Sequence, residues 1–173
     1  MKSNRQFVIL FKGLSAGNHD FVFDVDKRFF DDFEGSEIKE GKINVFVNLA
    51  KTANFLELSF RLKGSVLMTC DRCLDEFELP IEYLTKLYVK FGDATDVQDD
   101  EIIMLPYSES ELDIKQFIYE YVHLSLPYKR VHPNDKKGKS TCNAEMLKKL
   151  GEYSVKEHTE TPWDDLKKLM NKN

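Results

Sequence analysis

Apolar and polar residues alternate along much of the first hundred positions, which is the pattern of β-strands that bury one face. The alternation is clearest at 43–49 and 56–62, where every second residue is apolar, and a short turn at 51–54 separates these runs. Two such runs joined by a short turn predict a β-hairpin with one shared apolar face. Phe46 faces the opposite way, so we expect that second face to be partly apolar.

A second long alternation and several short aromatic-rich runs predict further strands. Gly64 precedes a continuation of the hairpin's second strand, which indicates a bend or a bulge at this glycine. Pro80 lies near the start of the long alternation. Because proline lacks a backbone N–H, it suits an edge strand or a bulge better than a central strand. The further predicted strands are 7–11, 21–25, 65–69, 79–91 and 102–105.

Two segments have helical rather than strand spacing. Three phenylalanines between 29 and 33 predict one or two helical turns, and from Asp113 apolar residues recur with the spacing of an amphipathic helix. Asp113 suits the N-cap of this second helix, with Gln116 reaching back as in a capping box, and Pro127 ends it. We expect the helix to pack on the sheet. Its apolar positions are Ile114, Phe117, Ile118, Tyr121 and Val122.

The residues after Pro127 differ in composition and lack a long apolar period. They predict a basic loop, a short helix at 144–150 that Gly151 ends, and a last helix that begins at Thr161. We therefore divide the chain into an α+β core domain, 1–127, and a basic loop with a helical C-terminal tail, 128–173, packed on the core or extending from it. The predicted fold class is α+β. It comprises an antiparallel twisted sheet or partly closed β-barrel, covered by one main helix.

Composition and charge narrow the class of protein. The 173 residues are 42% hydrophobic, which is enough for a substantial core. The formal net charge of −5 argues against a uniformly basic nucleic-acid binder but allows a local basic patch. No run of 18 apolar residues and no signal-peptide pattern occurs, so we expect a cytoplasmic protein without a membrane partner.

The basic loop is the candidate for such a patch. Five cations there could neutralise RNA phosphates and release counterions, which makes binding depend on salt. Tyr128 and His132 could stack on unpaired bases. A solvated loop without a partner is the alternative interpretation. The candidate RNA-binding residues are Lys129, Arg130, Lys136, Lys137 and Lys139.

Three cysteines supply the other candidate chemistry, and two of them, Cys70 and Cys73, form a C-x-x-C turn between predicted strands. Together with His132 and Cys142 they would give the three thiolates and one imidazole of a common tetrahedral zinc site. His132 and Cys142 lie ten positions apart, however, which is looser than usual for a ligand pair. Reduced cysteines buried in a tight turn are therefore the alternative, and zinc is an optional rather than a required cofactor.

Enzymatic chemistry has little support in the residues. No P-loop, dinucleotide-binding glycine motif, G-x-S-x-G or H-E-x-x-H occurs, so we expect neither catalytic residues nor a small-molecule substrate. A C-x-x-C redox site belongs at a helix N-terminus, whereas both flanks of this turn read as strands. A thiol-dependent redox enzyme is the weakest of the alternatives.

Three blocks of the chain carry a pattern of their own, and the first is Cys-Asp-Arg-Cys-Leu-Asp-Glu-Phe at 70–77. At every fixed position it resembles the C-x-R-C-L-x-x-F signature of the YceD (DUF177) family. Residues 112–127 resemble its block of a hydrophobic-Asp pair, a helix and Leu-x-Leu-Pro, and 162–169 resemble its closing Pro-Arg-x-x-x-Leu-x-x-Leu segment, with Trp163 in place of the usual arginine. Many members carry a second cysteine group after Leu-Pro, for which this chain has only His132 and Cys142.

The resemblance implies a non-enzymatic factor that supports the accumulation, processing or assembly of large-subunit (23S-type) ribosomal RNA. Its partner would be that RNA or a large-subunit ribosomal protein. Within the signature, Arg72, Leu74 and Phe77 are the candidate motif residues for partner binding. A zinc-stabilised protein–protein adaptor that never contacts RNA is the alternative function.

Overall fold

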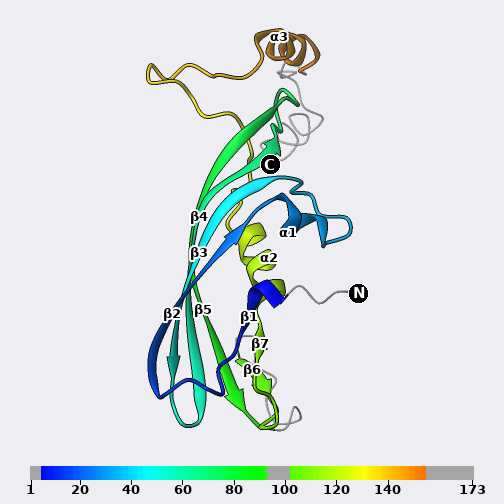
Figure 1. The fold of residues 1–173 in the computed structure, drawn as a ribbon. Helices are drawn as coiled ribbons and strands as arrows, with labels where there is room; N and C mark the ends of the chain where they lie inside the picture. The colour runs from blue at the N-terminus through cyan, green and yellow to red at the C-terminus, as the bar shows by residue number, and fades with distance from the viewer. Residues whose placement is uncertain (1–4, 93–101, 155–173) are drawn as a thin grey trace, which may run out of the picture.

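The computed structural model describes residues 5–92 and 102–154, and its centre is a five-stranded sheet. The strand order is β2-β3-β4-β5-β6, with antiparallel pairing except between β5 and β6 (Figure 1). The sheet is curved (Figure 1). It is open because its two edge strands, β2 and β6, do not pair with each other. The expected α+β fold is confirmed in its twisted-sheet form, and a closed barrel is not formed. The strands are β2 (Gly17–Val25), β3 (Gly41–Lys51), β4 (Phe55–Thr69), β5 (Glu76–Phe91) and β6 (Ile102–Leu105).

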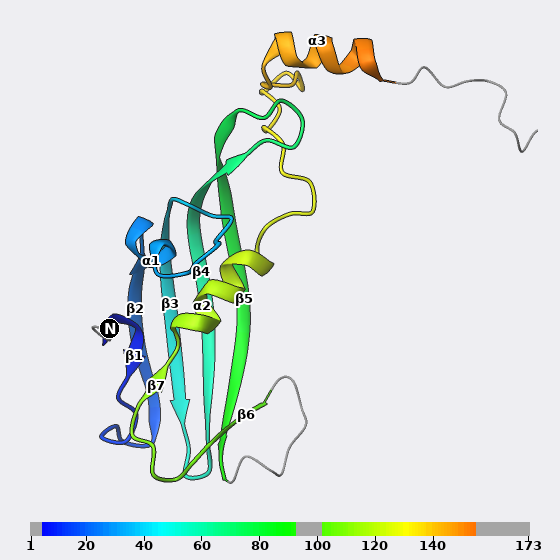
Figure 2. The ribbon, with the colours of Figure 1, turned by 90° about the vertical axis from the view of Figure 1, so that its right-hand side faces the viewer.

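The remaining elements lie on one face of this sheet or beyond its end. Helix α2 crosses the strands on that inner face (Figure 2). A small two-stranded sheet, β1 with β7, lies beside it, and α3 lies past one end of the strands (Figure 1). These elements are η1 (Arg5–Phe7), β1 (Val8–Ile9), α1 (Lys27–Asp31), β7 (Leu112–Asp113), α2 (Lys115–Leu124) and α3 (Ala144–Tyr153). None of the described helices is both long enough and apolar enough to cross a membrane.

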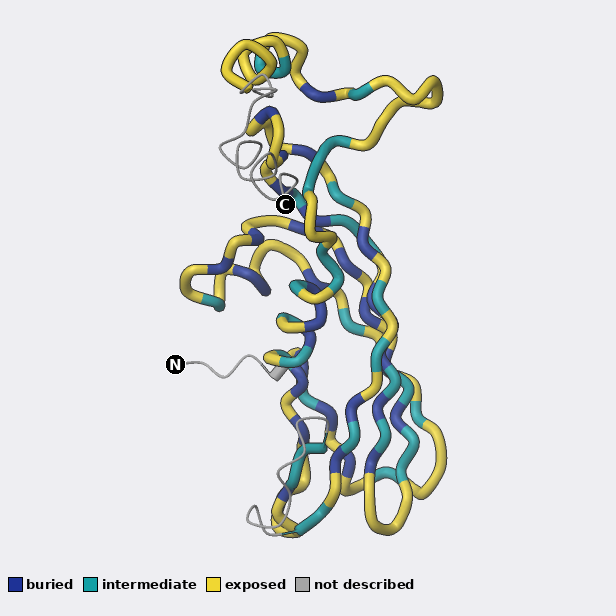
Figure 3. The backbone as a smooth tube through the Cα atoms, turned by 180° about the vertical axis from the view of Figure 1, so that it is seen from behind, coloured by how far each residue is buried: buried dark blue, intermediate teal, exposed yellow. Residues whose placement is uncertain are grey.

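The alternation in β3 and β4 produces the predicted hairpin. Their pairing runs from Lys51↔Leu56 to Gly41↔Val66 without interruption. The inward residues of both strands are buried against Ile118 and Val122 of α2 and the phenylalanines around α1, whereas Phe46 on the outer face is 37% exposed. Strands appear in Figure 3 as alternating buried and exposed positions. The partly apolar outer face that Phe46 indicates is therefore present.

Gly64 corrects one local prediction. The register continues through it, with Ile43 opposite on β3 and Ile81 opposite on β5, so no bulge occurs. A Cβ added at Gly64 would lie 2.0 Å from the carbonyl oxygen of Lys42 and 2.7 Å from the Cα of Ile43. The glycine is required because the backbone of β3 passes too close for any side chain.

Two helix-end predictions are also wrong. Asp113 lies in β7 and its side chain accepts from the N–H of Lys115, while Gln116 donates to Glu120, so no capping box forms. Pairing of the segment before α2 with β1 sets its start instead. Gly151 does not end α3, which continues to Tyr153, because a glycine with open space around it can remain helical.

Pro80 lies in a part of β5 that pairs with a neighbouring strand on one side only, as expected for an edge position. β5 pairs with β4 from Glu76 to Lys90, but only its last four residues, from Tyr88 to Phe91, pair with β6. Pro80 therefore belongs to a stretch of β5 with one open edge within the described residues. The predicted helix from Thr161 falls on 155–173, which lies outside the described residues, as 93–101 does.

Candidate metal centre

The C-x-x-C turn closes the end of the β4–β5 hairpin, where the two strands continue past the last β3 partner. The N–H of Cys70 donates to the carbonyl of Asp75 at 2.9 Å, and the N–H of Leu74 donates to the carbonyl of Cys70 at 3.0 Å. Leu74 adopts a φ of 64°, in the left-handed region that non-glycine residues rarely occupy. This conformation turns the chain back into β5 and leaves the Leu74 side chain 66% exposed.

A segment far along the chain lies against this turn. We call residues 128–154 the arm; it leaves the end of α2 and passes the tip of the hairpin (Figure 1). The N–H of Asp71 donates to the carbonyl of Arg130, and the N–H of Arg130 donates to the carboxylate of Asp71, both at 2.7 Å. This reciprocal pair places the arm beside the turn, two residues before His132.

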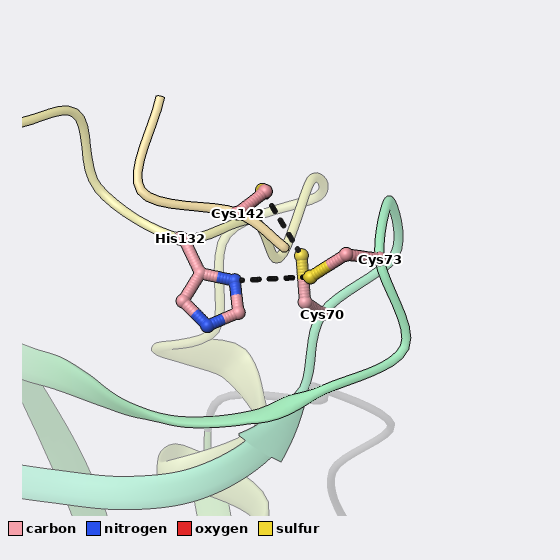
Figure 4. A group of neighbouring side chains, drawn as sticks. All are labelled: Cys70, Cys73, His132 and Cys142. Atoms are coloured by element: carbon pink, nitrogen blue, oxygen red, sulfur yellow. Dashed lines mark hydrogen bonds between the residues drawn. The ribbon is translucent and has the colours of Figure 1, made fainter. Parts of the chain in front are cut away.

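The four candidate ligands meet in one cluster (Figure 4). The Sγ atoms of Cys70, Cys73 and Cys142 and a ring nitrogen of His132 all lie within 4.8 Å of one another. The Sγ atoms of Cys70 and Cys142 are 3.8 Å apart, and Sγ of Cys73 is 3.4 Å from Nδ1 of His132. Tetrahedral zinc with ordinary bond lengths separates two sulfurs by about 3.8 Å, and a sulfur from a nitrogen by about 3.6 Å. The donor set and its spacing therefore fit a tetrahedral ion.

The surroundings of the two turn cysteines favour one thiolate over the other. Burial by itself raises the pKa of the Cys70 thiol, but hydrogen bonds from the backbone of Cys73, Arg72 and His132 and from the His132 side chain bring it down to about 6. The N–H of Arg72 lies 3.4 Å from the Cys70 sulfur. Burial raises the pKa of Cys73. Since metal binds the thiolate, Cys70 is the thiol best prepared to bind first.

The side chains around the cluster hold its ligands in place. The ring of Phe77 packs against that of His132, with centroids 4.6 Å apart, and Phe77 is buried. The amide of Asn143, next to Cys142, donates to the carboxylate of Asp75 at 3.2 Å. Of the three candidate partner-binding residues, Phe77 is thus buried against the ligand cluster. Arg72 and Leu74 are exposed on the turn.

The candidate RNA-binding residues fall into two groups. Arg130 is half-buried, and its guanidinium pairs with Glu37 and Asp71. Nothing in the sequence indicated these two acidic partners, because Glu37 is 93 positions away from Arg130. The lysines are exposed and have no ion-pair partner among the described residues. They are Lys129, Lys136, Lys137 and Lys139.

The last three of these lysines lie on a tight turn of the arm between Asn134 and Ser140. Asn134 and Ser140 form an isolated bridge, and the carboxylate of Asp135 accepts from the N–H groups of Lys137 and Lys139 at 2.9 and 2.8 Å. The bridge brings the two ends of the turn together. His132 and Cys142 can therefore meet despite their separation in sequence.

Comparison with known proteins identifies a family. Residues 58–170 match the model described as "Large ribosomal RNA subunit accumulation protein YceD", which is more than half of the chain. No curated protein and no solved structure gives a significant match. The matched residues contain the C-x-x-C turn, α2 and the arm, so the resemblance of the three sequence blocks is confirmed. The chain therefore belongs to the YceD family, and this membership implies a role in the accumulation of large-subunit ribosomal RNA.

Proposed function

We propose that the protein supports the accumulation of large-subunit ribosomal RNA as a non-catalytic factor. It would contact RNA through Lys136, Lys137 and Lys139, which we call the lysine turn of the arm. A zinc ion held by Cys70, Cys73, His132 and Cys142 would fix that arm to the sheet. The observation that carries the proposal is the clustering of these four ligands, since it joins the hairpin tip to the arm. The YceD family is not a known enzyme family, which agrees with a binding role.

The charges of the arm favour RNA as the ligand of the lysine turn. Lys136, Lys137 and Lys139 are exposed on one short turn, and the carboxylate of Asp135 in that turn accepts from the backbone N–H groups of Lys137 and Lys139. The net charge of −5 over the whole chain makes this local concentration of cations stand out. A phosphate backbone binds such a patch through counterion release. Tyr128, 97% exposed at the base of the arm, offers a ring on which an unpaired base can stack.

Replacing all three lysines of the turn by glutamine is expected to weaken binding to fragments of large-subunit ribosomal RNA. Three lost phosphate contacts should reduce the slope of log affinity against log salt by about 2 to 3. Fluorescence anisotropy at several salt concentrations measures both quantities. The matched control replaces Lys12, Lys27 and Lys39, which are exposed on other parts of the molecule.

The control variant loses the same charge, so it should retain nearly all of the affinity. Equal losses in the two triple variants would show that only net charge matters and would reject the lysine turn as the RNA contact. Salt-independent or absent RNA binding would favour the alternative of a zinc-stabilised adaptor that binds protein alone. Full activity in cells of a Cys70→Ser variant would remove the redox enzyme from consideration.

Leu74 provides a separate test of the turn as a contact surface. Its left-handed backbone costs about 1–2 kcal/mol for a residue with a Cβ, and its exposed side chain gains little in return. Leu74→Gly is therefore expected to raise the free energy of unfolding by about 1 kcal/mol, measured by urea denaturation. If the side chain contacts the partner, the same variant should lower the cellular ratio of large- to small-subunit ribosomal RNA. A stabilised variant with a normal ratio would mean that Leu74 contacts no essential partner.

A further inference from the structure

One border of the sheet is an unprotected strand. All nine residues of β2 pair with β3 in a regular register from Gly17↔Lys51 to Val25↔Ile43. Within the described residues, the other edge of β2 makes no backbone hydrogen bond, and Figure 2 shows the strand at the border of the sheet. Open edges are usually blocked by proline, charged side chains, a bulge or a covering segment. β5 has Pro80 and β6 for this purpose, whereas β2 has no proline, bulge or covering strand and carries only Asp20 and Asp24 as charged side chains.

The outer face of β2 carries two carboxylates with one apolar residue between them. Asp20, Val22 and Asp24 alternate along the strand, and Val22 is 60% exposed. The amide of Asn48 donates to Asp20 at 2.6 Å and that of Asn44 donates to Asp24 at 3.1 Å. These neutral partners orient the carboxylates without cancelling their charge.

Two other acids of this face are ion-paired. Glu57 pairs with Lys86 at 2.6 Å, and Glu82 pairs with Arg61 at 3.0 Å. Asp20 and Asp24 have no ion-pair partner among the described residues, although Lys42 and Lys63 border the hollow beside Asp24. The two carboxylates at the β2 border are therefore not engaged in ion pairs within the described residues.

Apolar area continues from Val22 onto the neighbouring strand only. The register places Phe46, 37% exposed, beside it on β3, and Arg61 of β4 follows in the same row. On the opposite face, Phe21 and Phe23 of β2 are only partly buried. A strand added at this border would cover apolar groups on both faces.

The charges decide what such a strand can be. If a second copy of β2 paired antiparallel and centred on Val22, Asp20 of each copy would lie opposite Asp24 of the other, and like charges directly opposite are destabilising. Nucleic acid is disfavoured because the carboxylates repel phosphates. A strand with lysine or arginine two positions on either side of an apolar residue places opposite charges across both pairs.

We infer that β2 binds an extended basic segment of a partner protein by strand addition, with an apolar residue of that segment beside Val22 and cations beside Asp20 and Asp24. Backbone hydrogen bonds supply the affinity, and the alternating side chains supply the specificity. β2 precedes the residues that match the family, and it lies on a different element from the lysine turn. Strand addition at β2 and RNA binding by the arm can thus succeed or fail independently.

The test uses the full chain and the heptapeptide Ser-Lys-Thr-Val-Thr-Lys-Ser, followed by amide chemical shifts in ¹⁵N-labelled protein. We expect the shifts to be centred on β2 and β3. The double variant Asp20→Asn/Asp24→Asn should weaken binding roughly tenfold, because two partly exposed ion pairs are lost. It keeps an acceptor for both asparagine amides, so its fold is expected to be retained. Glu76→Gln/Glu78→Gln removes the same charge from exposed positions on β5 and should leave affinity unchanged.

Two altered peptides separate strand addition from general attraction. Glutamate in place of both lysines should abolish binding, and N-methylation of alternate backbone nitrogens should abolish it while keeping the charge. Equal binding of the N-methylated peptide would overturn strand addition. Unchanged affinity in the Asp20/Asp24 variant, or shifts centred on another element, would overturn the assignment to β2. Concentration-dependent shifts at β2 without peptide would show a second copy at this border and would overturn the basic partner.

Discussion

Replacing Cys142 by serine is expected to remove zinc from the protein and to release the arm from the hairpin tip. Cys142 is the only sulfur ligand that the arm contributes, and its Sγ lies 3.8 Å from that of Cys70. A hydroxyl is a poor zinc ligand, so the variant keeps three ligands and no closed site. Metal analysis of full-length protein purified without chelator should give a zinc-to-protein ratio near one for the natural chain and near zero for Cys142→Ser.

The arm is expected to depend on the metal because its other contacts with the hairpin are weak. Ion pairs such as those of Arg130 are worth about 1 kcal/mol or less each when partly exposed. The contact between the Phe77 and His132 rings adds about 1 kcal/mol. Structural zinc contributes apparent free energies of about 10–16 kcal/mol in small zinc-binding peptides. Loss of a bound zinc ion would therefore remove the largest single contribution to holding the arm.

Hydrogen exchange measures this release independently of the metal content. The N–H groups of Asp71 and Arg130 bond between turn and arm, so peptides that contain them should exchange faster in Cys142→Ser. Thr141→Ser, one residue away, keeps a hydroxyl for the carbonyl of Pro133 and should retain both zinc and protection. A natural chain that purifies without zinc and still protects these amides would show that the cluster is simply a set of packed reduced cysteines.

The sheet could be predicted where one physical rule dominated. A strand that buries one face must alternate, so the β3–β4 hairpin and the outward position of Phe46 followed from the order of residues alone. The capping box at Asp113 failed because pairing of β7 with β1 competes with local capping. A glycine within a predicted strand, such as Gly64, is compatible with a bulge and with a close approach of the neighbouring strand. The sequence alone does not distinguish these two structures.

The candidate metal centre was predictable in its ligands but not in its construction. Cysteine and histidine are few in this chain, so Cys70, Cys73, His132 and Cys142 could be named from residue type. The wide spacing of the second pair argued against them, because the Asn134–Ser140 bridge that closes the intervening loop has no sequence signature. The ion pair between Arg130 and Glu37 likewise joins segments that are distant in sequence. An arginine and a glutamate so far apart do not indicate that they pair.

Replacing Gly64 by alanine is expected to destabilise the sheet by about 3 kcal/mol or more, the upper end of the cost of overpacking. The added Cβ would lie 2.0 Å from the Lys42 carbonyl oxygen and 2.7 Å from the Cα of Ile43. These are backbone atoms, so no side-chain rotation can relieve the overlap. β3 and β4 would have to separate near the open end of the hairpin, where Ile43 and Val66 are buried in the core.

Urea unfolding followed by circular dichroism measures this cost. With a slope of about 1–3 kcal/mol per molar urea, the loss corresponds to a midpoint lower by about 1–3 M. Gly13→Ala is the matched control, because an added Cβ there meets no atom within 4 Å and should change stability by less than about 0.5 kcal/mol. A Gly64→Ala midpoint as little changed as that of the control would mean that the two strands separate at no cost. In that case the close approach, and with it the reason for a glycine in this strand, would be wrong.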